Sequence, residues 1–276
     1  MRISPTTLLA VAASAFTLAV TGPGAPAVAA AGCVRPLVVA HRGSGTGPIE
    51  NSIASVSSAV NSTAQWIEFD VRASRDGVPF LLHDTTLDRT TTGTGVASDL
   101  SWSKLSSMRI KGDGEPLPLL TSYLRRVAQT KLSLLLEIKT PMSTAQVQRV
   151  VRVIYREGLA TRTVVHSFSE RALTVTRNYS LALHPRQPLR TGLLSVTGDL
   201  HPVRLARQLH VSLYEPPFAW VEQHPRRMEW LRAAHISVLT WTPDATSQWQ
   251  MLLGQHVTGI ITDYPLQLMQ TEHSTC

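Results

Sequence analysis

The sequence predicts an α/β fold, a TIM (β/α)8 barrel with a small insertion after its second strand. Short apolar runs alternate with helix-like segments, there are eight such units, and the 276-residue length suits one barrel of about 250 residues. The runs are too short and too continuously apolar for half-exposed antiparallel strands, so the alternation favours a parallel sheet. Eight units favour closure into a barrel over an open, doubly wound sheet.

The expected elements follow one another regularly, with one interruption. Strands are expected at 37–40, 66–71 with a hairpin extension at 78–82, 132–138, 163–168, 189–196, 211–214, 237–241 and 259–262. Helices are expected at 52–62, 119–128, 144–157, 170–178, 202–208, 225–235, 245–253 and 265–270. Residues 85–118 break the rhythm, since they are rich in Thr, Ser, Gly and Asp and only weakly periodic. A segment of about 30 residues without clear elements is typical of a functional insertion.

The first residues have the pattern of a secretory signal peptide. Arg2 precedes an apolar run at 8–20, and residues 25–31 offer several small-residue cleavage sites. We therefore expect a cleaved signal peptide at 1–31, a mature domain at 32–276, secretion, and no stable membrane span after cleavage. An uncleaved anchor is disfavoured because the run is short against the roughly 20 residues of a span. A lipoprotein acylated at Cys33 is also disfavoured, because Ala30 stands where a Leu-like residue is expected.

The two cysteines, Cys33 and Cys276, lie at the two ends of the mature chain. Export to an oxidising compartment allows them to pair, and closing a barrel brings the first strand beside the last element. We therefore consider a Cys33–Cys276 disulfide, with two unpaired thiols as the alternative.

The net charge is +7, and the basic residues are scattered apart from pairs at Arg125-Arg126 and Arg226-Arg227. Because no basic stripe is interleaved with aromatic residues, we expect no nucleic-acid partner. A basic surface can still attract small anionic substrates.

Polar residues stand at the predicted carboxyl ends of the first strands, where barrel enzymes place their catalytic groups. They are His41, Arg42, Glu68, Asp70, His83, Glu137 and Lys139. Residues two apart on a strand share a face, so Glu68 and Asp70 point the same way. Glu68, Asp70 and Glu137 in one barrel mouth would repel one another without a cation. Oxygen donors without cysteine suit one divalent cation, Ca²⁺ or Mg²⁺, rather than zinc.

A cation beside Arg42 and Lys139 creates a site for an oxyanion such as a phosphodiester. Imidazole titrates near neutral pH, so His41 and His83 suit general acid–base catalysis. One would deprotonate the attacking hydroxyl and the other would protonate the leaving alkoxide, in an order that the sequence leaves open. Either histidine alone is more often a hydrogen-bonded strand-end residue, but two in this setting favour catalysis.

Several motifs, in order, resemble those of the glycerophosphodiester phosphodiesterase family. His41-Arg-Gly and Pro48-Ile-Glu50-Asn51-Ser52 resemble its HRG and PENT opening. Further matches are Glu68-Phe-Asp70-Val71, Asp76-Gly77-Val78-Pro79, His83-Asp84, residues 87–93 and Glu137-Ile-Lys139, with weaker ones at 166–168, 241–242 and 259–265. The resemblance spans about residues 37–265.

The resemblance implies a TIM barrel with an insertion after strand 2. It implies a metal on Glu68, Asp70 and Glu137, an acid–base pair in His41 and His83, and phosphate contacts from Arg42 and Lys139. The small-molecule substrate would be a glycerophosphodiester, cleaved to glycerol 3-phosphate and an alcohol. The route implied is attack by the neighbouring glycerol hydroxyl, followed by hydrolysis of a cyclic phosphate.

The sequence departs from the family pattern at a few positions. There is one extra residue at 48–50, Ser52 replaces Thr, Leu82 replaces the first His of the HHD segment, and His166 stands where Gln is usual. Residues 191–217 match poorly, and in the family this region often shapes the leaving-group pocket, so the sequence does not identify the released alcohol.

Four further residues are secondary candidates. Glu50 is expected either to support the metal or to bind a substrate hydroxyl. Trp241 is expected to line the glycerol pocket or to be a buried aromatic. Asp263 is expected to cap the last helix, and Glu215 to be a rim residue or a substrate contact.

Two other functions would each need a particular sequence feature. A phospholipase D-like enzyme acting on lysophospholipid or sphingolipid would need apolar loops beside the mouth, for which residues 214–220 are the candidate stretch. A non-catalytic binding protein on the same fold would be favoured by loss of one of the two histidines or three carboxylates. The sequence retains all of them: His41, His83, Glu68, Asp70 and Glu137.

Overall fold

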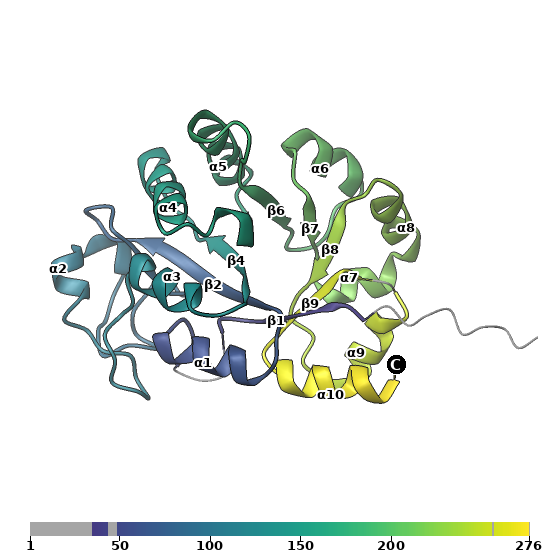
Figure 1. The fold of residues 1–276 in the computed structure, drawn as a ribbon, viewed down its shortest axis with the longest axis horizontal. Helices are drawn as coiled ribbons and strands as arrows, with labels where there is room; N and C mark the ends of the chain where they lie inside the picture. The colour runs from purple at the N-terminus through teal and green to yellow at the C-terminus, as the bar shows by residue number, and fades with distance from the viewer. Residues whose placement is uncertain (1–34, 44–48, 256, 276) are drawn as a thin grey trace, which may run out of the picture. The chain divides into compact units, whose positions relative to one another are not determined.

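The computed structural model describes residues 35–43, 49–255 and 257–275 (Figure 1). The predicted signal peptide at 1–31 and both cysteines of the considered disulfide lie outside these residues. Within them, no helix is both long and apolar enough to cross a membrane.

The strands form a closed barrel, as predicted. They are β1 (Leu37–Ala40), β2 (Trp66–Ala73), β3 (Pro79–Leu81), β4 (Ser133–Ile138), β5 (Thr163–Ser167), β6 (Arg190–Leu194), β7 (Leu213–Glu215), β8 (Ser237–Thr240) and β9 (Gly259–Thr262). Hydrogen bonding runs in the order β1-β9-β8-β7-β6-β5-β4-β2, and β1 closes the ring on β2. All these pairs are parallel, whereas β3 lies outside the ring as an antiparallel partner of β2.

Helices surround the strands in Figure 1. They are α1 (Ile53–Asn61), α2 (Trp102–Leu105), α3 (Leu120–Ala128), α4 (Thr144–Arg156), α5 (Glu170–Leu183), α6 (Pro202–Leu209), α7 (Phe218–Gln223), α8 (Pro225–Ala233), α9 (Thr246–Leu253) and α10 (Pro265–Thr275). Ser52 and Ser143 begin α1 and α4, because each hydroxyl accepts a hydrogen bond from a first-turn amide.

Helix α7 was not predicted, because its six residues are too few to show helical periodicity. Pro217 precedes it in extended conformation, and the helix buries Trp220 and Val221. Burial against the barrel therefore stabilises a helix that its own sequence does not announce.

The insertion at 85–118 is ordered and has a small core of its own. Leu87, Ala97, Leu105 and Ile110 are buried together with Phe80 of β3. Its elements are short: the 3₁₀ turn Ala97–Asp99, helix α2 and a few isolated bridges, such as Thr86 with Val96. In Figure 1 it stands at the left, around α2 and beyond α3.

The barrel interior is closed by a layer of apolar side chains. One strand-borne cluster consists of Val39, Leu135, Val164, Leu213, Leu239 and Ile261, all buried. Two residues further along the same strands lie His41, Glu137, His166, Glu215, Trp241 and Asp263. Because strand side chains alternate, these groups share the inward face and form a polar layer just above the apolar one.

Candidate active site

The loop after β1 turns sharply at Arg42 and Gly43. Arg42 has φ +52° and Gly43 φ +83°, both left-handed. A Cβ on Gly43 would lie 2.3 Å from the Ser55 hydroxyl, so glycine is required there. The left-handed conformation costs a residue such as Arg42 about 1–2 kcal/mol. In return, its main-chain amide donates to Glu68 Oε2 at 2.8 Å, which fixes that carboxylate.

Glu68, Asp70 and Glu137 are buried, and each offers a ligand atom within 4.8 Å of the others. Asn51 fixes Asp70 twice: its side-chain amide donates to Oδ2 at 2.8 Å, and its carbonyl oxygen accepts from the Asp70 amide at 2.9 Å. Burial and the charge of Asp70 raise the pKa of Glu137 to about 7. Such a cluster of buried oxygen donors in mutual repulsion fits a hard divalent cation.

Two cations border the carboxylates. Lys139 Nζ lies 2.9 Å from Glu137 Oε1 and 3.4 Å from Asp70 Oδ1, and Arg42 Nε lies 3.7 Å from Asp70 Oδ2. Burial opposes the charged form of Lys139, but Asp70 and Glu137 outweigh it and raise its pKa. Burial likewise acts against ionisation of Asp70, but Lys139, His83 and Arg42 hold its pKa well below the usual range.

His41 is held by a carboxylate from the far end of the chain. Its Nδ1–H donates to Asp263 Oδ1 at 2.5 Å, and its Nε2 lies 3.9 Å from Glu68 Oε2. Burial lowers the pKa of His41, but the hydrogen bond to Asp263 and the charge of Glu68 reverse this, so the net shift is upward. Asp263, expected as a helix cap, instead orients His41.

His83 has a partner from its own loop. Its Nδ1–H donates to Asp84 Oδ1 at 2.7 Å, and its main-chain carbonyl accepts from Arg72 at 2.7 and 3.1 Å. Burial is the largest influence and lowers the pKa of His83. The attraction of Asp70 opposes this, but Lys139 and Arg42 add to the lowering, and the net shift is downward.

Glu50 is buried and bridges two arginines. Its carboxylate accepts from Arg42 at 3.1 and 3.2 Å and from Arg89 at 2.6 and 2.9 Å. It does not belong to the set of carboxylates within 4.8 Å of one another. Both oxygens of Glu50 accept from guanidinium groups, so direct metal ligation by Glu50 finds no support, and its evident action is to hold Arg42.

A cavity of about 130 Å³ opens onto this polar layer. It is lined by His41, Arg42, Glu68, His83, Glu137, Lys139, His166, Phe168, Leu194, Trp241, Thr242 and Ile261. Trp241 is half-buried, its ring meets Phe168 edge-on at 5.6 Å, and its Nε1–H donates to the Glu215 carbonyl at 2.8 Å. It therefore lines the cavity wall opposite the charged groups that β2 and β4 supply.

From the sequence, Asn51, Arg89 and His166 had no predicted role in the site, and Asp263 and Glu215 were expected in other roles. Glu215 is neither a rim residue nor exposed, because its Oε2 accepts from His166 Nδ1 at 2.9 Å inside the barrel. The sequence position of three of them indicated an inward direction, since His166, Glu215 and Asp263 each lie two residues after a member of the buried apolar cluster in the barrel interior. Their partners could not be read from position, because they come from other strands.

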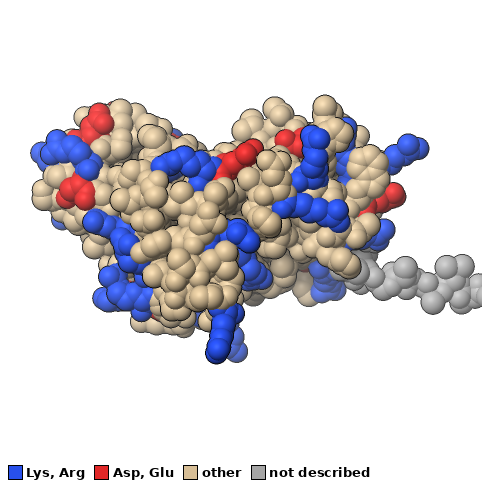
Figure 2. Space-filling view, turned by 90° about the horizontal axis from the view of Figure 1, so that it is seen from above, with Lys and Arg blue, Asp and Glu red and all other residues tan. Residues whose placement is uncertain are grey.

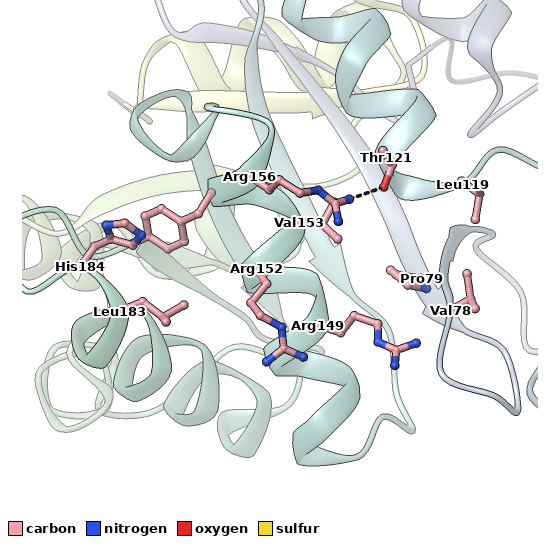
Figure 3. Close-up of a pocket in the computed structure, with 11 residues that line it drawn as sticks. Val78, Pro79, Leu119, Thr121, Arg149, Arg152, Val153, Arg156, Leu183 and His184 are labelled. Carbon is pink, nitrogen blue, oxygen red and sulfur yellow. Dashed lines mark hydrogen bonds between the residues drawn. The ribbon is translucent and has the colours of Figure 1, made fainter.

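A larger cavity of about 610 Å³ lies on the outside of the barrel, between β3, α3, α4 and α5 (Figure 3). Arg149, Arg152 and Arg156 of α4 line it, together with Tyr155 and His184. Their guanidinium groups donate to the Gly77 carbonyl, the Tyr179 hydroxyl and the Thr121 hydroxyl. No carboxylate lines it, so it has neither the acid–base groups nor the ligands of the barrel mouth. In Figure 2, basic side chains on the visible face form separate groups rather than a stripe.

The stretch 214–220 does not supply an apolar mouth. Tyr214 and Trp220 are buried, with their rings packed edge to face at 5.6 Å, and Phe218 is half-buried in α7. The feature that would have favoured a lipid-binding phospholipase D-like enzyme is therefore core packing.

Comparison with known proteins agrees with this geometry. The profile of the "Glycerophosphoryl diester phosphodiesterase family" matches residues 41–267. The chain is 26% identical over 244 residues to the glycerophosphodiester phosphodiesterase of Caldanaerobacter subterraneus subsp. tengcongensis, covering 86% of this chain and 97% of that one. It also resembles two solved structures. A glycerophosphodiester phosphodiesterase from Agrobacterium tumefaciens has a TM-score of 0.72 at 25% identity, covering 87% and 100% of the two chains. An Oleispira antarctica phosphodiesterase, solved with the product sn-glycerol-3-phosphate, has a TM-score of 0.72 at 24% identity, covering 86% and 96%.

The family match spans the whole polar layer, from His41 after β1 to Asp263 after β9. The chain therefore belongs to the glycerophosphoryl diester phosphodiesterase family and is an enzyme that hydrolyses phosphodiesters.

Proposed function

We propose that the chain hydrolyses small glycerophosphodiesters to sn-glycerol 3-phosphate and an alcohol, with a divalent cation on Glu68, Asp70 and Glu137 and with His41 and His83 as the acid–base pair. The observation that carries the proposal is that both imidazoles, two of these carboxylates, Arg42 and Lys139 line one 130 Å³ cavity, with Asp70 buried beside them. The product found in the Oleispira antarctica relative supports the choice of substrate.

The chain's own groups can bind the phosphodiester by charge. Arg42 and Lys139 are oriented by Glu50, Asp70 and Glu137, so they can meet the nonbridging oxygens without reorganising. A bound cation, proposed as Ca²⁺ or Mg²⁺, would withdraw charge from the same oxygens.

The two imidazoles can then move the protons. One histidine removes the proton of the neighbouring glycerol hydroxyl, whose oxygen bonds to phosphorus. The other protonates the departing alkoxide as its P–O bond breaks, which leaves a cyclic phosphate on the glycerol. In the second half, the histidines exchange roles: one deprotonates a water, whose oxygen bonds to phosphorus, and the other protonates the glycerol oxygen that attacked in the first half as its P–O bond breaks. Asp263 and Asp84 would each hold one imidazole in a single tautomer.

We also propose that the enzyme is secreted. Residues 1–31 would be a cleaved signal peptide and 32–276 the mature enzyme, which would act after secretion. The basic pattern supports a small anionic substrate rather than nucleic acid.

Release of glycerol 3-phosphate from glycerophosphocholine tests the proposal. The purified enzyme would be assayed with Ca²⁺, with Mg²⁺ and with EDTA, alongside His41→Ala and Glu68→Gln. Matched controls are His201→Ala and Glu222→Gln, which change exposed residues outside the cavity. We expect cation-dependent release that both site variants lose and both controls keep. Release that is unchanged in EDTA after metal stripping would contradict the cation, and release by His41→Ala at the parent rate would contradict the acid–base role.

A further inference from the structure

A third imidazole lines the cavity and borders the carboxylate cluster, and the proposed mechanism does not use it. His166 is buried on β5, and its strand position is the direct neighbour of Glu137 on β4. Its Nε2 lies 3.8 Å from Glu68 Oε1 and has no hydrogen-bond partner among the described residues. A buried ring nitrogen without a partner is costly, so its direction toward the cluster calls for a reason.

The other ring nitrogen is fixed. His166 Nδ1–H donates to Glu215 Oε2 at 2.9 Å, and Glu215 is fully buried. A histidine that ligates a metal typically donates its second ring N–H to a carboxylate in this way. The Nε2 lone pair would then be directed toward the carboxylate cluster.

A neighbouring strand makes room for the pair. Gly192 on β6 stands beside His166 in the sheet and is followed in register by Leu213 on β7. A Cβ at Gly192 would lie 2.2 Å from Glu215 Oε1 and 3.3 Å from His166 Cβ. The missing side chain on β6 therefore lets a carboxylate of β7 reach an imidazole of β5.

The distance from His166 to Glu68 suits a shared ion, although His166 lies outside the set of donors within 4.8 Å of one another. Two donors with bonds of about 2.1 Å to one ion lie roughly 3.0–4.2 Å apart, depending on the angle between the bonds. The 3.8 Å between His166 Nε2 and Glu68 Oε1 falls in this interval. The proton that the imidazole carries without metal would leave on binding, as ligand protons do.

We propose that His166 is a fourth, nitrogen ligand of the cation, with Glu215 as the carboxylate that orients it. The inference rests on the proposed cation site at Glu68, Asp70 and Glu137. One imidazole beside three carboxylates shifts the preference from Ca²⁺ and Mg²⁺ toward Mn²⁺ and later transition ions, which bind imidazole more strongly. The usual glutamine at this position would offer a carbonyl oxygen and no such preference.

Metal binding, measured without any substrate, tests the inference. Titration calorimetry of the metal-stripped protein would give the affinity for Mn²⁺ and for Ca²⁺, and pulsed electron paramagnetic resonance of the Mn²⁺ form would detect ¹⁴N coupling. We expect ¹⁴N coupling in the parent and its loss in His166→Gln but not in His41→Ala. Mn²⁺ affinity should fall by roughly ten- to a hundredfold in His166→Gln and in Glu215→Gln. Ca²⁺ affinity should change by less than about threefold, since glutamine retains an oxygen donor.

The single variants leave Glu215 or His166 buried without its partner, so folding must be secured. The double variant His166→Gln/Glu215→Gln keeps two groups that can hydrogen-bond to each other, and it should lose Mn²⁺ preference and ¹⁴N coupling while keeping Ca²⁺ binding. His201→Gln is the matched control, at an exposed histidine.

The outcomes separate the two proposals. If the parent binds neither ion, or Glu68→Gln binds both as the parent does, the cation site itself is wrong. If the parent binds Mn²⁺ without ¹⁴N coupling, or the double variant keeps the parent's Mn²⁺ preference, the cation site stands and His166 is not its ligand.

Discussion

The two histidines that we propose as the acid–base pair are each paired with an aspartate, but the pairs are built in different ways. His41 and Asp263 are 222 positions apart and meet because β1 and β9 are neighbours in the closed ring, with Ala40 beside Thr262. His83 and Asp84 are adjacent in the chain, on the loop after β3. The side chain of His41 is 17% exposed and that of His83 is 32% exposed.

The difference shows in the charge that each imidazole favours. Burial lowers the pKa of both imidazoles. For His41, the hydrogen bond to Asp263 and the charge of Glu68 reverse this, whereas for His83 Lys139 and Arg42 add to it, so the net shifts have opposite directions. Two histidines that line one small cavity thus have pKa values shifted in opposite directions. A pair of imidazoles separated in this way suits a division into acid and base.

The largest effect is expected from removing either imidazole. His41→Ala and His83→Ala should each lower kcat for glycerophosphocholine by about 10²- to 10⁴-fold. A substrate with a nitrophenol leaving group needs no general acid for its departure, so it should restore the first step of one variant and not of the other. Rates of nitrophenol release by both variants measure this, with His201→Ala as the control. Restoration of both variants, or of neither, would refute a divided acid–base pair.

Next in size is Asp263→Asn, which keeps the shape of the His41 partner but removes its charge. Asp263 raises the pKa of His41, so its loss lowers that pKa, and the limb of the kcat profile that reports His41 should move to lower pH. We expect kcat at the optimum to fall by roughly ten- to a hundredfold, less than on loss of the imidazole. The pH profile of kcat measures both effects, and a profile that keeps its limbs in place would argue against the pairing.

Asp84→Asn should have a smaller effect in the same direction. Its hydrogen bond raises the pKa of His83, but it is the last of the influences on that group, after burial, Asp70, Lys139 and Arg42. A half-exposed pair is also better screened by water. We expect a fall in kcat of about three- to tenfold, with the limb for His83 moving to lower pH. The kcat–pH profiles of the two variants would be measured side by side. A larger shift of the profile in Asp84→Asn than in Asp263→Asn would show that Asp84 is the more important of the two aspartates.

The smallest effect is expected at Arg89, which binds both Asp84 and Glu50. Its side chain is 47% exposed, so each ion pair contributes little. Arg89→Met should lower kcat/KM by about two- to threefold, because Arg42 keeps Glu50 in place. Steady-state kinetics measure this effect. The control is Arg125→Met, which removes an ion pair with Glu157 outside the cavity. Equal effects of both substitutions would show that Arg89 has no special link to the site.

The barrel could be predicted because its signals are local. The apolar runs from Leu37 to Thr262, the helix-like segments between them and the polar residues at the strand ends are all visible along the chain. Helix α7 and the core of the insertion could not, since both depend on burial against other parts of the chain.

The sequence by itself determined the fold class and the seven charged or titratable residues from His41 to Lys139, because each lies at or just after the end of a predicted strand. Only the tertiary structure decided their partners: Asp263 for His41, Glu50 for Arg42, and Glu215 for His166. Ring closure and strand register bring these groups together, and the sequence does not encode distances between residues of different strands. The pKa shifts follow from those partners and from burial, so they too belong to the folded protein.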